Sequence, residues 1–117
     1  MNIREYVRNI LTNEEILNLT EDKKVYFLTG GEEAKPTYVC YQIIDEYGSF
    51  FEENEEVITA FNVQVDIFSK GSYSQLEQII KDKMKQAGFY RGMAADLYEN
   101  DTGLYHKAMR FSINLSK

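Results

Sequence analysis

The chain has very few of the residues on which disulfides and metal sites depend. Its 117 residues include one cysteine, Cys40, one histidine, His106, and no tryptophan. A single cysteine cannot form an intrachain disulfide, and no thiolate cluster is available to hold zinc. We therefore expect no bound metal and no cofactor. Because strand-forming residues surround Cys40, we expect a small buried hydrophobic side chain there rather than a reactive thiol.

Long apolar runs are also absent. No stretch approaches the roughly 20 apolar residues that span a bilayer, and residues 1–5 lack the charged-then-apolar order of a signal peptide. The sequence thus predicts a cytoplasmic protein with no membrane contact. A hydrophobic content of 44% in 117 residues is enough for one core, so we expect a single domain over residues 1–117.

Catalytic motifs are missing as well. Neither a Gly-Lys-Ser/Thr phosphate-binding loop nor a GxGxxG sequence occurs. A histidine-based enzyme would have to use His106 with Asp96, Asp101 or Ser112, and the sequence does not determine whether these residues meet. The strand-like surroundings of His106 favour a structural, hydrogen-bonded role. We expect no catalytic residues and no enzyme activity.

The net charge of −6 is concentrated in one segment, residues 45–56. This segment contains six carboxylates and no lysine or arginine: Asp45, Glu46, Glu52, Glu53, Glu55 and Glu56. Such a layout argues against binding to a phosphate backbone, which needs clustered basic residues. It is compatible with a solvated loop, with a basic protein partner, or with a surface that DNA passes without sticking. The segment lacks the spacing of an EF-hand, so calcium is not expected.

Hydrophobic periodicity predicts the element order helix, strand, strand, strand, helix, strand, strand. The predicted helices cover 3–11, with a further turn at 16–19, and 74–87; the predicted strands cover 25–28, 38–44, 57–68, 89–98 and 105–115. Capping boxes at Thr12 with Glu15 and at Ser74 with Glu77 are expected to start helices, and Gly88 is expected to end one as a left-handed cap. Segment 45–56 is expected to be an extended hairpin loop.

These elements predict an α+β fold, an antiparallel sheet of four to five strands with two main helices packed on one face. The apolar stripe of the second helix consists of Leu76, Ile79, Ile80, Met84 and Ala87. Its opposite side, with Lys81, Asp82, Lys83 and Lys85, is expected to be solvated. Strand alternation leaves the second sheet face polar, facing solvent or another subunit: Asn62, Gln64, Asp66, Phe68, Arg110, Ser112 and Asn114.

Part of the chain resembles a known family. The strand from Val63 to Lys70, the helix end Ala87-Gly88-Phe89, and above all the segment DLYENDTGLYHKAMRF at 96–111 are similar to small tail-completion proteins encoded by prophages of Gram-positive bacteria. That family belongs to the tail-terminator, or head-to-tail joining, group of long-tailed phages. The resemblance covers 38–115, about two thirds of the chain.

The resemblance implies a structural subunit, without catalysis or cofactor, that forms a hexameric ring on the tail tube. The implied partners are further copies of the chain, the tail tube protein and the head completion or connector protein, while DNA passes without specific binding. The implied location is the head-tail junction of the virion, after assembly in the bacterial host cytoplasm. The interaction surface is then expected to include Glu52, Glu53, Glu55, Glu56, Asn62, Gln64, Asp66 and Arg110.

Other classes stay open at this point. A non-phage cytosolic adaptor or immunity-type protein would use the acidic segment on one basic partner, and would be a stable monomer or dimer. Within phages, head-completion and minor tail proteins have a similar size and also perform no chemistry. An enzyme based on His106 is the least favoured alternative.

Overall fold

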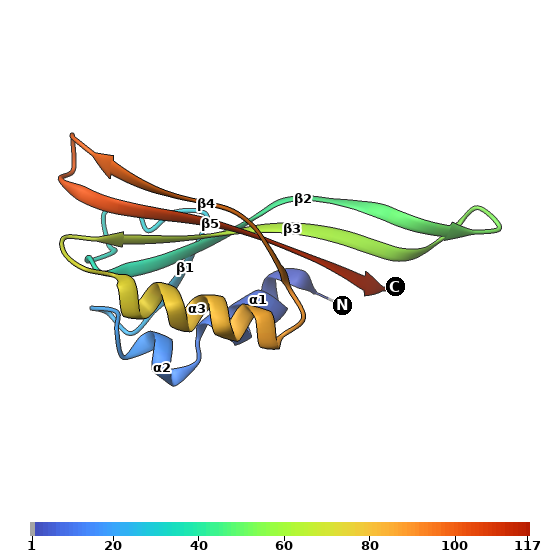
Figure 1. Cartoon of the computed structure of the whole chain (residues 1–117), viewed down its shortest axis with the longest axis horizontal. Helices are drawn as coiled ribbons and strands as arrows, with labels where there is room; N and C mark the ends of the chain where they lie inside the picture. The colour runs from blue at the N-terminus through green and yellow to red at the C-terminus, as the bar shows by residue number, and fades with distance from the viewer. Residues whose placement is uncertain (1) are drawn as a thin grey trace.

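A computed structural model describes residues 2–117 as one mixed sheet with all helices on one of its faces (Figure 1). The elements are α1 (Ile3–Leu11), α2 (Glu14–Leu17), β1 (Val25–Phe27), β2 (Tyr38–Glu52), β3 (Glu55–Ser69), α3 (Ser74–Gln86), β4 (Tyr90–Glu99) and β5 (Leu104–Ser116). The predicted α+β class and the two main helices on one face are therefore confirmed.

The strand order is β1-β2-β3-β5-β4, and all neighbours pair antiparallel except β1 with β2. The prediction of a wholly antiparallel sheet is wrong at this edge, where Val25 pairs with Val39 in a parallel register. The glycine pair at 30–31 suggested a simple turn. The chain instead reverses twice in segment 28–37, using left-handed residues at Leu28 (φ 70°) and Gly31 (φ 58°), and so enters β2 in the same direction as β1.

The core lies between the helices and the sheet. Each main helix contributes an apolar stripe, and β3 and β5 contribute every second residue, as expected for periods of 3.6 and 2. The buried residues include Ile3, Val7 and Leu11 of α1, Leu76, Ile80 and Met84 of α3, Val63, Val65 and Ile67 of β3, and Met109, Phe111 and Ile113 of β5. The predicted stripe of α3 is thus confirmed.

The helix ends agree with the prediction in one place and differ in two. Gly88 (φ 101°) ends α3 as predicted. The box of Thr12 with Glu15 is wrong: the side chain of Asn13 accepts the hydrogen bond from the Glu15 amide, and the Thr12 hydroxyl donates to a carbonyl of α1. The box at Ser74 is also wrong, because Ser74 is already inside α3 and no side chain caps its start.

Candidate functional site

Segment 45–56 is not a loop, and this is the largest difference from the sequence prediction. β2 continues to Glu52 and β3 begins at Glu55, so only Glu53 and Asn54 form the turn. Both have left-handed φ angles, 51° and 67°, as a two-residue type I′ hairpin requires. The two strands project well beyond the helices (Figure 1). We term residues 45–58 the arm.

A β-bulge explains why the strand pattern was not recognised beyond Ile44. The pairing of β2 with β3 shifts between Ile43 and Asp45, so the period-two alternation of apolar residues is interrupted there. Beyond the bulge, the aromatic residues of the arm are the remaining sequence feature that favours a strand. They are all exposed in the structure: Tyr47 by 57%, Phe50 by 48% and Phe51 by 55%.

The arm carries its carboxylates without basic partners. Across residues 2–117, none of the six carboxylates of segment 45–56 forms an ion pair. Glu52, Glu53 and Glu55 are exposed at the tip, and Glu56 accepts a 2.6 Å hydrogen bond from the Thr59 hydroxyl. The four glutamates predicted as interaction residues therefore lie together at the distal end of the arm.

The other four predicted interaction residues lie in a row on the open face, which is the sheet face opposite the helices, and three of them are joined by hydrogen bonds. Arg110 Nε donates to Gln64 Oε1 at 3.1 Å, and Gln64 Nε2 donates to Asp66 Oδ1 at 2.9 Å. Asn62 Oδ1 accepts from the Ser112 hydroxyl at 2.6 Å, and Asn62 Nδ2 donates to Asp45 Oδ1 at the base of the arm, also at 2.6 Å. The row does not reach the arm glutamates, because six strand residues, or about 20 Å, separate position 62 from position 56.

His106 lies at one end of the open face and is hydrogen-bonded, as predicted. Its Nε2 atom is 2.7 Å from Asp66 Oδ1, and its Nδ1 atom is 3.6 Å from Glu99 Oε2. Its ring stacks on Phe68 with a centroid separation of 4.2 Å. Because Asp66 is only 5% exposed, these contacts form a packed cluster rather than an open cleft.

The three acid-base partners suggested for His106 lie elsewhere. Asp96 accepts from the Tyr73 hydroxyl at 2.6 Å, and Ser112 donates to Asn62. Asp101 lies in the turn between β4 and β5. The sequence left open whether any of these residues meets His106; in the structure the partner of His106 is Asp66, which the sequence pattern did not single out.

Cys40 is 3% exposed, which confirms the prediction of a small buried residue. Burial, with a smaller contribution from the nearby Asp66 carboxylate, raises the pKa of the Cys40 thiol to about 11. The thiol therefore stays protonated near neutral pH.

Both sides of the sheet present unpaired strand edges. β4 pairs only with β5 within residues 2–117, and its side chains from Tyr90 to Tyr98 are all exposed. Met93 is 72% exposed and Leu97 is 49% exposed. At the opposite edge of the sheet, β1 pairs with β2 only up to Tyr41, so the outer edge of β2 from Gln42 to Glu52 is unpaired within residues 2–117. Free edges of this kind are templates for pairing with another chain. β4 has no proline or lysine, but it carries Arg91 and Asp96, and its pairing with β5 is irregular between Arg91 and Ala94.

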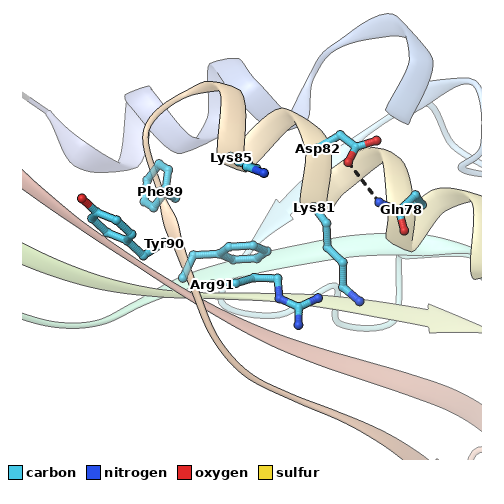
Figure 2. A pocket seen from close by; sticks show the side chains of 8 residues that line it. Gln78, Lys81, Asp82, Lys85, Phe89, Tyr90 and Arg91 are labelled. Atoms are coloured by element: carbon cyan, nitrogen blue, oxygen red, sulfur yellow. Dashed lines mark hydrogen bonds between the residues drawn. The ribbon is translucent and has the colours of Figure 1, made fainter.

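A groove of about 420 Å³ lies between α3 and the start of β4 (Figure 2). It is lined by Gln78, Lys81, Asp82, Lys85, Phe89, Tyr90, Arg91 and Phe111. Phe89 and Phe111 are buried and form its apolar base. Three cationic side chains against one carboxylate make the groove basic. Figure 2 shows Lys81 extending from α3 toward the guanidinium of Arg91 on β4.

The prediction of a solvated face for the α3 lysines was incomplete. Lys81 and Lys85 are one turn apart, and this spacing could have indicated a common basic stripe. The contribution of Arg91 could not be seen in the sequence, because the pairing of β4 with β5 brings it beside α3. Lys81 is also paired with Glu77, whereas Lys85 forms no ion pair with any residue in 2–117.

No protein-family model matches the chain, and none of the curated protein sequences matches it. No described helix is long and apolar enough to cross a lipid bilayer. Within residues 2–117, no group of three or more histidine, cysteine or acidic side chains is arranged to hold a metal ion. The features on which a function can be based are therefore the arm, the open face, the two strand edges and the basic groove.

Proposed function

We propose that the protein is a tail-completion or terminator protein of a phage or prophage, which caps the tail tube as a ring and joins the tail to the head connector. The observation that supports this best is the pair of different unpaired edges on opposite sides of the sheet, β4 and the outer edge of β2. A subunit with two different adhesive surfaces associates head to tail, and such contacts close into a ring when the rotation per subunit allows it.

The remaining surfaces fit a structural role without catalysis. The likeness of segment 96–111 to tail-completion proteins concerns β4, the following turn and β5, which include one of the two edges. The hydrogen-bonded polar row of the open face and the arm offer surfaces for the tube and connector proteins. With a net charge of −6, the subunit repels DNA, as a channel that DNA must cross requires. The proposed location is the head-tail junction, reached from the host cytoplasm.

The first test is the mass of the purified protein over a wide concentration range, with electron microscopy of the largest species. The expected result is a closed ring, six-fold if the resemblance holds, that binds one end of isolated tail tubes and stops their growth. A matched variant, Leu97→Lys, places a charge on the β4 edge and should weaken ring formation without unfolding the subunit. Lys70→Glu, outside both edges, is the control.

A strict monomer that fails to cap isolated tubes would overturn the proposal. If that monomer instead bound one cationic protein tightly, the adaptor class would replace it.

A further inference from the structure

We propose that the arm of one copy pairs along β4 of the next copy, and that the acidic tip of the arm fills the basic groove between α3 and β4. This inference rests on the proposed ring and identifies the contact that builds it. The two surfaces belong to the same chain but point in different directions, since the arm projects from the body and the groove lies between α3 and β4 (Figures 1 and 2). Each copy therefore supplies one surface and receives the other.

Strand direction permits this pairing. β2 runs antiparallel to β3, β3 to β5, and β5 to β4, so β2 and β4 run in opposite directions within a subunit. A second copy in the same orientation, placed beside β4, presents its β2 antiparallel to that strand. The sheet would then continue from one copy to the next with ordinary antiparallel hydrogen bonds.

Edge length limits the register to two neighbouring alignments. β1 covers β2 at Val39–Tyr41, which leaves the outer edge of β2 free from Gln42 onward to Glu52. Pairing all ten residues of β4 within this eleven-residue edge aligns Tyr90 with Glu52 or with Phe51. A larger shift in one direction brings β1 against β4, and a shift in the other leaves the first part of β4 unpaired. The alignment of Glu52 with Tyr90 is the one proposed, and it places the turn at Glu53 next to the groove.

Charge supports the same register independently. The groove has Lys81, Lys85 and Arg91 on its walls, and Lys85 and Arg91 are exposed. The tip has glutamates at 52, 53 and 55 that lack cationic partners among residues 2–117. Complementary charges across a contact determine its register and suppress other partners. The apolar base of the groove and the exposed aromatic residues of the arm supply apolar area to the same contact.

A nucleic acid is the other class of anion that a basic groove can attract. With Lys81 paired to Glu77, Lys85 and Arg91 beside Asp82 form a small site, whereas phosphate-backbone binding uses a basic stripe or patch. Six carboxylates on each arm would also repel DNA from the same assembly. A second copy of this chain is therefore the better occupant.

Charge reversal tests the contact. In the full chain, Glu52→Lys with Glu53→Lys should raise the dissociation constant between subunits by about tenfold or more, and Lys85→Glu with Arg91→Glu should do the same. Combining the four changes should restore much of the lost affinity. Lys24→Glu with Lys70→Glu, which changes the charge equally at exposed lysines outside the groove, should leave assembly unchanged. Sedimentation measures the dissociation constant, and circular dichroism checks that each variant is folded.

A cross-link tests the register. In a Cys40→Ala background, Glu52→Cys with Tyr90→Cys should form disulfides between copies and give a ladder of covalent oligomers under oxidation. Each single cysteine variant should give no species larger than a covalent dimer. The arrangement would be supported if the double cysteine variant gave ladders and if adding Lys85→Glu with Arg91→Glu abolished them.

The possible failures are distinguishable. Rings that persist in both charge-reversed pairs, or a double cysteine variant without ladders in intact rings, would overturn the arm contact and leave the proposed function standing. A wild-type protein that neither oligomerises nor cross-links would overturn both. If the groove variants lost binding to a duplex DNA fragment while rings persisted, the groove would be a nucleic-acid site and the inference would be wrong.

Discussion

The body and the arm of this protein are built from the same two strands, and they differ in what covers those strands. In the body, Val63, Val65 and Ile67 of β3 are fully buried under the helices, and β5 pairs alongside. In the arm, β5 reaches only to Ile58, and none of the described helices lies beneath the strands (Figure 1). A two-stranded ribbon is only marginally stable by itself. The arm is therefore a part of the fold that a partner can stabilise.

The two regions also differ in whether their charged side chains form ion pairs. In the body, the ammonium of Lys107 is buried and lies 3.2 Å from Asp96 and 3.5 Å from Glu77, which links β5 to β4 and to α3. The arm carries several like charges with no cation in reach among residues 2–117. Charge stabilises the body internally, whereas in the arm it remains available for an external partner.

The largest expected effect is a difference in stability between two isoleucine-to-alanine variants of the same strand. Ile67→Ala removes a fully buried side chain from the body and should lower the free energy of unfolding by about 2–5 kcal/mol. Ile58→Ala, at the half-buried base of the arm, should cost about 1 kcal/mol or less. Urea unfolding of both variants measures the difference. Equal losses would mean that the arm belongs to the cooperative core.

The sequence predicted the body well because its signals are local and regular. The stripes of α1 and α3 and the alternation along β5 have clear periods, so both helices and β5 were found close to their true bounds. Two features depended on contacts that no local pattern contains. The parallel pairing of β1 follows from how segment 28–37 reverses, and the bulge after Ile43 hides the continuation of β2 into the arm.

The next expected effect, a smaller change in stability, comes from removing a buried or an exposed ion pair. Lys107→Met leaves the partly buried Glu77 with one cation fewer and should cost about 2 kcal/mol, less than for an isolated buried pair because Lys81 still neutralises Glu77. The matched control is Lys83→Met, which removes the pair of Lys83 with the exposed Glu15 and should change stability by about 0.5 kcal/mol at most. Thermal unfolding compares the two variants. A cost for Lys83→Met as large as that for Lys107→Met would contradict this difference.

The stability loss in Lys107→Met should depend on pH, because Lys107 contacts the titratable side chain of Asp96. Hydrogen bonds from Tyr73 and from Lys107 hold the pKa of Asp96 below its ordinary value. A carboxyl with a lowered folded-state pKa stabilises the fold above its unfolded-state pKa, about 4, and this contribution is lost as the pH falls through the folded-state pKa. The gap in stability between wild type and Lys107→Met should therefore narrow below about pH 4. A gap that widened there would show that Asp96 does not contribute to the cluster.

The candidate site was only partly predictable, for a similar physical reason. Composition located the carboxylates of the arm, which are close together in the sequence, and the alternation along β3 and β5 located the polar residues of the open face. The basic groove combines Lys85 of α3 with Arg91 of β4, and the β4 edge becomes a surface only because β4 is the last strand of the sheet. Such features arise from the order of strands, which the sequence pattern does not contain.

The smallest expected effect lies at the turn of the arm. Glu53→Asn with Asn54→Gly matches the type I′ preference and should slow hydrogen exchange of the arm amides severalfold, a gain of up to about 1 kcal/mol that is confined to the arm. Asn54→Val, with a β-branched residue at φ 67°, should speed the same exchange. Amides of the buried part of β3 should exchange equally in all three proteins, because the arm opens without the body. A parallel change in the body amides would show that the two regions unfold together, and the arm would then lose the independence that docking on a neighbouring copy requires.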